Sequence, residues 1–321
     1  MPPSPDSPAS VTVACPAKVN LALSVGGPEA SGYHPIASWM TALKFADTLT
    51  LQRLEPDPQA HRTPESIYTL GFADDAPVPG RIDWPLEKDL AYQAHRALED
   101  AVGRHLPIEL TLRKRIPTGA GLGGGSSDAA GVLVGVDRLF GLGLSDTALR
   151  RCAAALGSDV PFLVAALQGE TFAVASGFGE RLRPTPYPGS VDLVLVLPPL
   201  SCPTGGVYRA FDELAGAYAT VDEARIAGLA RCRPSSAADL FNDLADAACR
   251  VCPPLAEARR RVAEATGRRV HVTGSGAAMF LLAADRHDAR TLADRIAEAT
   301  GIASIATRAL PPHGDSGPSD V

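Results

Sequence analysis

The stretch Pro117–Asp128, with the sequence PTGAGLGGGSSD, has the residue types best suited to binding an anion. Glycine lets backbone N–H groups approach an anion closely, because no Cβ stands in the way. An alternating apolar run at 108–116 precedes the stretch, and a run with apolar residues at helical spacing follows it. A strand, a glycine loop and a helix in this order point unpaired N–H groups and the positive end of a helix dipole toward one place. We therefore expect this loop to hold the phosphate groups of a nucleotide.

The expected phosphate contacts are Pro117, Thr118, Gly119, Ala120, Gly121, Leu122, Gly123, Gly124, Gly125, Ser126 and Ser127. A loop that only caps a helix would not need so many glycines, since each costs chain entropy on folding. A dinucleotide fingerprint also fits the spacing of the glycines, but it requires a second strand after the helix. Here a second helix is expected instead, with Ser145 as its cap. A Walker motif is absent, because no Gly-Lys-Ser/Thr closes the loop.

Lys18 and Asp159 are two further residues that could do chemistry. Lys18 lies among apolar and small residues, an awkward position for an ammonium without an anionic partner. From its own stretch alone, a lysine at a bend between two strands explains it as well. Asp159 follows Gly157 and precedes Pro161, so it sits in a short turn, where a carboxylate that caps the backbone is the alternative. The local sequence leaves both alternatives open.

Tyr33 and His34 follow a turn and could stack on a planar ligand and hydrogen-bond to it. Packing at a sheet edge is the other explanation for such a pair. Tyr208 lies on a helix expected in the second half of the chain, together with Phe211.

Composition excludes several classes of protein. The chain has 321 residues and a net charge of −6, which argues against a nucleic-acid binder with a broad basic face. Cys249 and Cys252 form a lone C-x-x-C without a second pair or a histidine cluster, so we expect no zinc site. The apolar runs are too short for a membrane span, and residues 1–10 do not resemble a signal peptide. We expect a cytoplasmic protein.

The expected elements divide between two halves. The strands lie at 11–14, 19–25, 36–45, 48–54, 67–72, 108–116, 171–175, 180–182, 191–197, 269–273, 277–283 and 302–307, and the helices include 87–102, 149–156, 222–230, 238–249, 255–266 and 286–300. The second half predicts an antiparallel sheet backed by helices. A Pro-rich run at 184–189 suits a connection, so we expect domains at 10–183 and 184–310, with disordered tails at 1–9 and 311–321.

Four stretches occur together in one order: Pro16–Leu21, the glycine loop, Leu156–Phe162 and Thr273–Ala277. In this combination the chain resembles the GHMP small-molecule kinases over nearly its whole length. Three marks, Pro16–Leu21, Gly32–His34 and Ser158–Phe162, make it most similar to the branch that acts on a cytidyl-linked methylerythritol in non-mevalonate isoprenoid synthesis.

The resemblance implies an α+β fold of two domains, an N-terminal ribosomal-protein-S5-domain-2-like α/β domain and a C-terminal ferredoxin-like α+β domain, with the active site in the cleft between them. It implies ATP on the glycine loop, with Mg²⁺ bridging its phosphates, although no carboxylate cage marks a dedicated metal site. The cytidine end of the substrate would lie near Tyr33, His34 and Tyr208. The turn at Gly274, Ser275 and Gly276 would border the transfer centre.

In the resembled family a lysine and an aspartate act at the accepting hydroxyl, and these map onto Lys18 and Asp159. Asp159 would take the hydroxyl proton, and Lys18 would keep that carboxylate ionised and offset developing charge. Two alternatives remain: another GHMP kinase, acting on homoserine or a mevalonate derivative, or a nucleotide-binding protein without catalysis. The expected partner is a small molecule with a cytidyl group, without nucleic acid or membrane, and the chain is expected to be a monomer or a homodimer.

Overall fold

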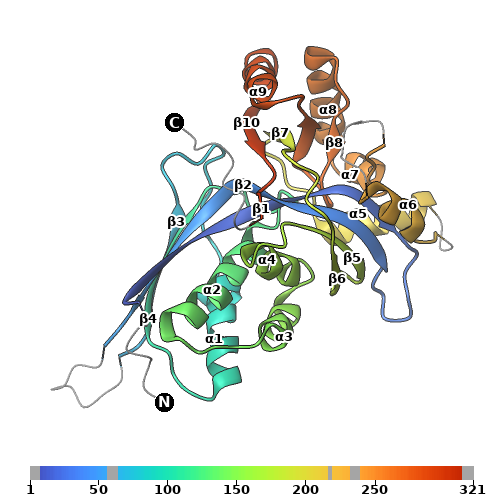
Figure 1. Cartoon of the computed structure of the whole chain (residues 1–321). Coiled ribbons are helices and arrows are strands. Elements are labelled where there is room, and N and C mark those ends of the chain that lie inside the picture. The colour runs from blue at the N-terminus through green and yellow to red at the C-terminus, as the bar shows by residue number, and fades with distance from the viewer. Residues whose placement is uncertain (1–7, 56–63, 216–218, 232–238, 313–321) are drawn as a thin grey trace.

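Two β-sheets with their helices make up the computed structural model, which describes residues 8–55, 64–215, 219–231 and 239–312 (Figure 1). The first sheet has six strands in the order β3-β4-β2-β5-β6, and β1 also pairs with β2. Its strands are β1 (Ser10–Val25), β2 (Ile36–Arg53), β3 (Ile67–Phe72), β4 (Ile108–Lys114), β5 (Phe172–Gly177) and β6 (Arg181–Pro184). The β3–β4 pair is parallel and the other pairs in this sheet are antiparallel.

Four α-helices cover one side of the long β1–β2 ribbon, as Figure 1 shows. They are α1 (Leu90–Val102), α2 (Gly124–Phe140), α3 (Asp146–Leu156) and α4 (Val160–Leu167), and the short 3₁₀ turn η1 (Leu86–Lys88) precedes α1. Helix α2 is almost entirely buried. Two of its glycines let it approach the sheet: a Cβ at Gly131 would lie 2.4 Å from Cys15 Sγ, and one at Gly135 would lie 2.6 Å from Leu51 Cδ1.

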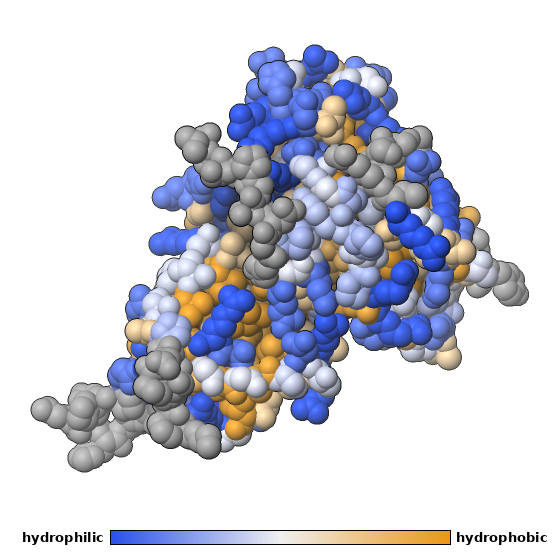
Figure 2. Space-filling model, viewed as in Figure 1, coloured by the Kyte–Doolittle hydropathy of each residue, from blue (hydrophilic) through white to orange (hydrophobic). Residues whose placement is uncertain are grey.

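The second sheet has four antiparallel strands in the order β10-β7-β9-β8. These are β7 (Asp192–Leu197), β8 (His271–Val272), β9 (Met279–Leu282) and β10 (Ala303–Arg308). The helices of this half are α5 (Thr204–Ala215), α6 (Glu223–Leu229), α7 (Ala245–Val251), α8 (Pro253–Thr266) and α9 (Arg286–Thr300). Figure 2 shows a hydrophilic surface over α8 and α9 and more apolar residues over the region of α1 and α2.

The two sheets share a hydrophobic cluster. Trp39 and Leu43 of β2 pack in it with Leu193 and Leu195 of β7 and Phe280 of β9. The backbone also connects the halves, since Leu310 N donates a hydrogen bond to Ala42 O at 2.8 Å. The two halves of this α+β architecture are therefore joined by apolar packing and by backbone hydrogen bonds.

Several expected elements differ from the observed ones. The strands expected at 11–14 and 19–25 form one strand, β1, whose register against β2 shifts between Pro16 and Lys18. A bulge accommodates Pro16, which has no N–H to donate, so the strand does not end there. Likewise 36–45 and 48–54 form the single strand β2.

The segment after Asp159, expected to be a short turn, is helix α4, because proline is tolerated in the first turn of a helix. The helix expected at 238–249 is the shorter α7, and its residue 238 lies outside the described residues. Most of both expected tails, residues 1–7 and 313–321, also lies outside them. The hairpin at β5–β6 and helix α9 agree with their predictions.

Candidate active site

Lys18 and Asp159, 141 positions apart in the chain, form an ion pair in the cleft. Lys18 Nζ lies 3.2 Å from Asp159 Oδ2, and Lys18 is only 4% exposed. Lys18 comes from the bulged part of β1, and Asp159 is the residue before α4. The Asp159 side chain makes no capping hydrogen bond to that helix, so its carboxylate faces the ammonium instead. This carboxylate keeps 30% of its side-chain surface exposed to the cleft.

Asn20 gives Lys18 a second, neutral partner. Lys18 Nζ donates to Asn20 Oδ1 at 2.8 Å, and Asn20 Nδ2 donates to Ser38 Oγ at 2.8 Å. Asn20 N donates to Thr273 Oγ1 at 3.0 Å, which ties β1 to the second half of the chain. Sequence reasoning did not assign a role to Asn20 or Thr273, although both lie inside motifs that it singled out. The residues that they contact are distant in the sequence, so residue spacing could not indicate these contacts.

The glycine loop lies between β1 and the turn at 273–278. Lys18 N donates to Leu122 O at 2.9 Å, and Ala278 N donates to Ala120 O at 3.0 Å. Gly121 has φ +79°, and a Cβ there would lie 2.6 Å from Thr273 O. This close approach of two backbone segments explains why glycine is needed at Gly121.

The loop residues Pro117 to Ser126 line a cavity of about 320 Å³. Ser127, in contrast, is completely buried and does not line this cavity. Trp84 and Asp89 also line this cavity. Asp89 Oδ1 accepts from Ala91 N at the start of α1, and Asp89 Oδ2 accepts from Trp84 Nε1 at 3.0 Å. The lining of the cavity thus includes both a planar aromatic residue and the backbone of the glycine loop.

A buried ionic cluster holds the base of the loop. The Lys114 ammonium contacts the carboxylates of both Asp47 and Asp128. Asp47 Oδ1 also accepts hydrogen bonds from the backbone N–H groups of Arg115 and Ile116, directly before the loop. The Lys114 side chain is only 3% exposed, although Lys114 lies in a run of three basic residues, 113–115, that gives no sign of burial.

Burial raises the pKa of Asp128 to about 8, and the nearby Asp47 carboxylate adds to the shift against the opposing effect of Lys114. Burial lowers the pKa of Lys114, but the two carboxylates raise it by more, so it lies above its ordinary value. Lys114 is therefore the stable cation of the cluster, and two carboxylates compete for it.

Two more cavities continue the cleft beyond the loop. One, of about 430 Å³, contains Lys18 and Asp159 and shares Gly119, Gly121 and Gly123 with the loop cavity. The other, of about 930 Å³, shares Tyr208 with the cavity around the ion pair. The ion pair thus lies between a cavity lined by bare amides and a larger cavity with aromatic walls.

The three aromatic residues predicted from the sequence all line the cavity of about 930 Å³. The rings of His34 and Tyr208 lie 4.8 Å apart between centroids, and His34 Nε2 lies 2.8 Å from Asp212 Oδ1. Tyr33 is 68% exposed at the rim, where its ring meets the edge of Phe178. Burial, with the negative charge of Asp159, raises the pKa of Tyr208 to about 12, so its hydroxyl stays protonated at neutral pH.

The turn at 274–276 borders the cavity that holds the ion pair. Gly274 and Ser275 line this cavity, and the Ser275 and Thr204 hydroxyls are hydrogen-bonded at 3.0 Å. Gly276 does not line the cavity. It supports the turn instead, because Gly276 N donates to Thr273 O at 2.9 Å.

The metal-ligating side chains do not gather in one place. In the described part of the chain, no group of three or more His, Cys, Asp and Glu side chains could hold a metal ion. The Ser127 hydroxyl is buried and has no hydrogen-bond partner within the described ranges. None of the described helices is long and apolar enough to cross a membrane.

The comparisons with known proteins agree with this geometry. The family described as GHMP kinases N terminal domain matches residues 89–168. The 4-diphosphocytidyl-2-C-methyl-D-erythritol kinase of Moorella thermoacetica is 38% identical over 298 residues, which is 91% of this chain and 96% of that protein.

Solved structures of GHMP kinases are also similar to this chain. A crystal structure of 4-(cytidine 5'-diphospho)-2C-methyl-D-erythritol kinase matches with a TM-score of 0.71 and 33% identity, covering 94% of this chain and 100% of that one. A homoserine kinase from Cytophaga hutchinsonii matches with a TM-score of 0.62 at 16% identity, over 95% of this chain and 96% of the other, which shows a shared fold only.

Proposed function

The chain belongs to the 4-diphosphocytidyl-2-C-methyl-D-erythritol kinases of the GHMP family, and we propose that Lys18 and Asp159 perform its phosphoryl transfer. It is an ATP-dependent kinase that phosphorylates the 2-hydroxyl of 4-diphosphocytidyl-2-C-methyl-D-erythritol in the non-mevalonate route to isoprenoid precursors. The observation that carries the assignment of the two residues is their 3.2 Å ion pair between the loop cavity and the aromatic cavity.

Asp159 is the general base of the proposed mechanism. Its partly exposed carboxylate can accept the proton of a hydroxyl that enters the cavity, and proton transfer of this kind contributes about 10²–10⁴-fold to a rate. Lys18 holds the Asp159 carboxylate in position through their ion pair, in which Nζ lies 3.2 Å from Oδ2. Its ammonium also offsets negative charge that develops on the transferred group, which is the main requirement of phosphoryl transfer.

ATP lies in this proposal with its phosphates on residues 117–126, which line the loop cavity, and its base toward Trp84. The amides of the loop and the start of α2 provide donors for phosphate oxygens. When bound, Mg²⁺ neutralises charge on the phosphates. Ser126, at the cavity wall, would offer a hydroxyl to this ion, which prefers oxygen ligands. The Ser127 hydroxyl is unpartnered but does not line the cavity.

The cytidyl end of the substrate lies in the cavity of about 930 Å³, against Tyr208 and His34, with Tyr33 at the rim. Aromatic rings offer a planar base a stacking surface, and the protonated Tyr208 hydroxyl adds a hydrogen-bond donor. Gly274 and Ser275 bound the space where the accepting hydroxyl meets Asp159.

We further propose that the enzyme is cytoplasmic and uses ATP as its phosphate donor. We expect it to be a monomer or a homodimer that does not bind nucleic acid. We divide it into domains at 10–183 and 184–310.

A panel of acceptors tests the proposed function. ADP release is measured with ATP and, in turn, 4-diphosphocytidyl-2-C-methyl-D-erythritol, homoserine and mevalonate. Of the three acceptors, we expect only the cytidyl compound to be turned over. We also expect cytidine nucleotides to compete with it, since the aromatic cavity suits a planar base. Turnover with homoserine or mevalonate, and indifference to cytidine nucleotides, would contradict the proposal.

A further inference from the structure

We propose that Arg209 of α5 binds the diphosphate of the substrate. This inference rests on the proposed function and adds a binding residue to it. The substrate 4-diphosphocytidyl-2-C-methyl-D-erythritol carries two ionised phosphate groups between its cytidine and the methylerythritol that is phosphorylated. Such charges are costly to remove from water unless cations or hydrogen-bond donors meet them. The chain must therefore provide these groups between the cytidyl end of the substrate and Asp159.

The diphosphate lies where two cavities of the cleft meet. The cytidyl end occupies the cavity of about 930 Å³, and the accepting hydroxyl meets Asp159 in the cavity of about 430 Å³. Two of the described residues that line both cavities belong to α5, so the diphosphate passes beside this helix. The residues that line both cavities are Ile36, Ser158, Thr204 and Tyr208.

Arg209 is a cation without a partner in this part of the cleft. Among the described residues that line the two cavities, lysine and arginine occur as Lys18 and Arg209. Lys18 is already paired with Asp159. Arg209 is exposed and makes no hydrogen bond or ion pair with any residue that the structure describes. Its charge is therefore available to an anion that enters the cavity.

The carboxylates around Arg209 have partners of their own. Glu180 lines the same cavity as Arg209, and its Oε1 lies 3.6 Å from Arg181 Nε. Asp212 follows Arg209 on α5, and its Oδ1 lies 2.8 Å from His34 Nε2. Neither carboxylate forms an ion pair with Arg209. A phosphate group at Arg209 would thus not have to displace an existing partner.

The position of the Arg209 guanidinium also favours an anion beside it. Its Nη1 lies 3.6 Å from the place of a Cβ on Gly205, and its Nη2 lies 3.9 Å from that of a Cβ on Gly206. Both glycines belong to the first turn of α5, a helix of 12 residues, so the guanidinium lies against that turn. The positive end of a helix dipole disfavours a lone cation and favours an anion. A phosphate group at this place would interact favourably with both, and the planar fork of arginine matches phosphate oxygens in pairs.

Calorimetric titration with CDP and with cytidine tests the role of Arg209. The ATP site is first filled with the β,γ-imido analogue of ATP, so that CDP cannot bind there. We expect Arg209→Gln to bind CDP about tenfold or more weakly than the wild type, because hydrogen bonds to a charged group are lost. The affinity for cytidine, which has no phosphate group, should not change. An unchanged affinity for the ATP analogue shows that the variant is folded.

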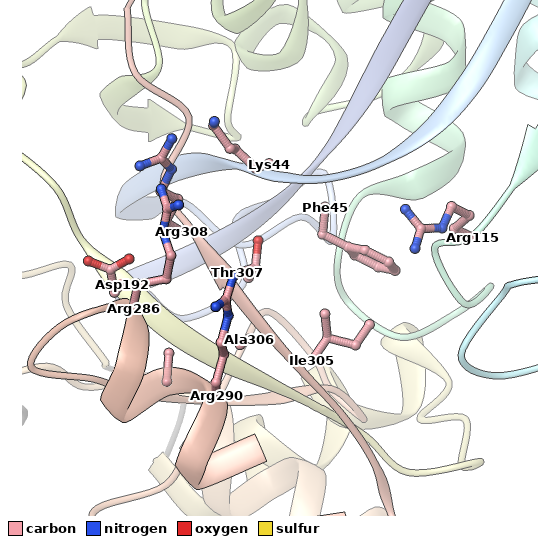
Figure 3. A pocket seen from close by; sticks show the side chains of 11 residues that line it. Lys44, Phe45, Arg115, Asp192, Arg286, Arg290, Ile305, Ala306, Thr307 and Arg308 are labelled. Atoms are coloured by element: carbon pink, nitrogen blue, oxygen red, sulfur yellow. The ribbon is translucent and has the colours of Figure 1, made fainter. Parts of the chain in front are cut away.

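Arg290→Gln is the matched control. Arg290 is also exposed and makes no hydrogen bond or ion pair within the described ranges. It lines a separate cavity, of about 310 Å³, which shares none of its described lining residues with the cleft (Figure 3). This variant loses the same charge and should bind CDP and cytidine as the wild type does.

Unchanged CDP affinity in Arg209→Gln would contradict the proposed role, and so would an equal loss of affinity for cytidine and CDP. The same loss of CDP affinity in Arg290→Gln would also contradict it, because the attraction would then come from the overall charge of the protein. These three results leave the proposed function intact. If the wild type itself bound no CDP, the proposed cytidyl site and the role of Arg209 would fail together.

Discussion

Lys18 is the central residue of the proposed catalytic site. It is nearly buried, yet it contacts a carboxylate, Asp159, and an amide oxygen, Asn20. A buried cation is costly unless it is paired and hydrogen-bonded, and these two partners meet both conditions. Asn20 fixes the position of the ammonium, while Asp159 supplies the opposite charge. The arrangement leaves the outer side of Asp159 open to a substrate hydroxyl.

At the substrate end, we predict that Tyr208→Leu raises the KM for the cytidyl substrate about threefold to tenfold, because a planar stacking partner is lost while apolar volume is kept. The affinity for ATP should not change. Steady-state kinetics and ATP titration measure the two effects. Tyr92→Leu, which removes an aromatic ring in contact with Tyr68 outside the cleft, is the control. Equal losses in both affinities would indicate a damaged fold and contradict the role of Tyr208.

Residue types alone indicated the phosphate loop and the pairing of a buried lysine with an anion. They could not identify Asn20, Thr273 or Asp212, because an amide, a hydroxyl or a carboxylate carries no sign of a partner in another part of the chain. For this reason the sequence did not indicate Asp212, whose Oδ1 lies 2.8 Å from His34 Nε2. The assignments of Lys18 and Asp159 came from the combination of motifs rather than from either residue.

Among the elements, the glycine loop is held in position by hydrogen bonds to the two segments beside it. Strand β1 binds it at Leu122, and the 273–278 turn binds it at Ala120. The loop therefore has little freedom to move away from a side chain added at its contacts.

We predict that Gly121→Ala weakens ATP binding at least about tenfold, because its Cβ would lie 2.6 Å from Thr273 O and the loop must shift. Gly103→Ala is the matched control, since Gly103 also has a positive φ, +64°, but nothing lies within 4 Å of its Cβ. It should cost about 1–2 kcal/mol of stability and leave ATP affinity intact. If both variants bound ATP as the wild type does, the close approach would have no role in the loop.

The cluster beneath the loop predicts a pH dependence. Because the pKa of Asp128 is raised to about 8 in the folded state, this group favours folding at low pH. Its contribution is complete below its ordinary pKa and is lost as the pH rises through 8. The free energy of unfolding of the wild type, minus that of Asp128→Asn, should therefore fall between pH 5 and pH 8.5. Urea denaturation at the two values measures this difference, and an increase would show that Asp128 is ionised beside Lys114.

The sequence predicted where helices and strands occur better than it predicted where each one ends. Strand β3 and helix α9 follow from clear periodicity and end signals, and Gly301 ends the helix as expected of a C-terminal glycine. The continuity of β1 through Pro16 was not predictable, because local sequence suggests a break where pairing with β2 supports a bulge. Helix α4 was missed because it is short and uniformly apolar, so it lacks a polar face.

At the scale of the whole molecule, the active site belongs to both halves of the chain. The first sheet provides Lys18, and the second half provides Tyr208, Gly274 and Ser275. Asn20 and Thr273 connect the two across the cleft. The shared hydrophobic cluster under this connection fixes the distance between the halves.

We predict that Thr273→Val destabilises the protein by about 1–3 kcal/mol, because the buried N–H of Asn20 loses its acceptor. Thr185→Val is the control, since the Thr185 hydroxyl is buried without a partner within the described ranges, and removing it should cost nothing measurable. Chemical denaturation of both variants measures the difference. Equal stabilities would mean that this hydrogen bond does not hold the halves together.

The role of the ion pair is tested most directly by Asp159→Asn, measured for both ATP affinity and turnover of the cytidyl substrate. Asp146→Asn, an exposed aspartate at the start of α3, controls for the loss of one charge. We predict that Asp159→Asn binds ATP as the wild type does and turns over at least about a hundredfold more slowly, while Asp146→Asn is normal in both. Turnover of Asp159→Asn within about tenfold of the wild type would contradict the assignment of Asp159 as the general base.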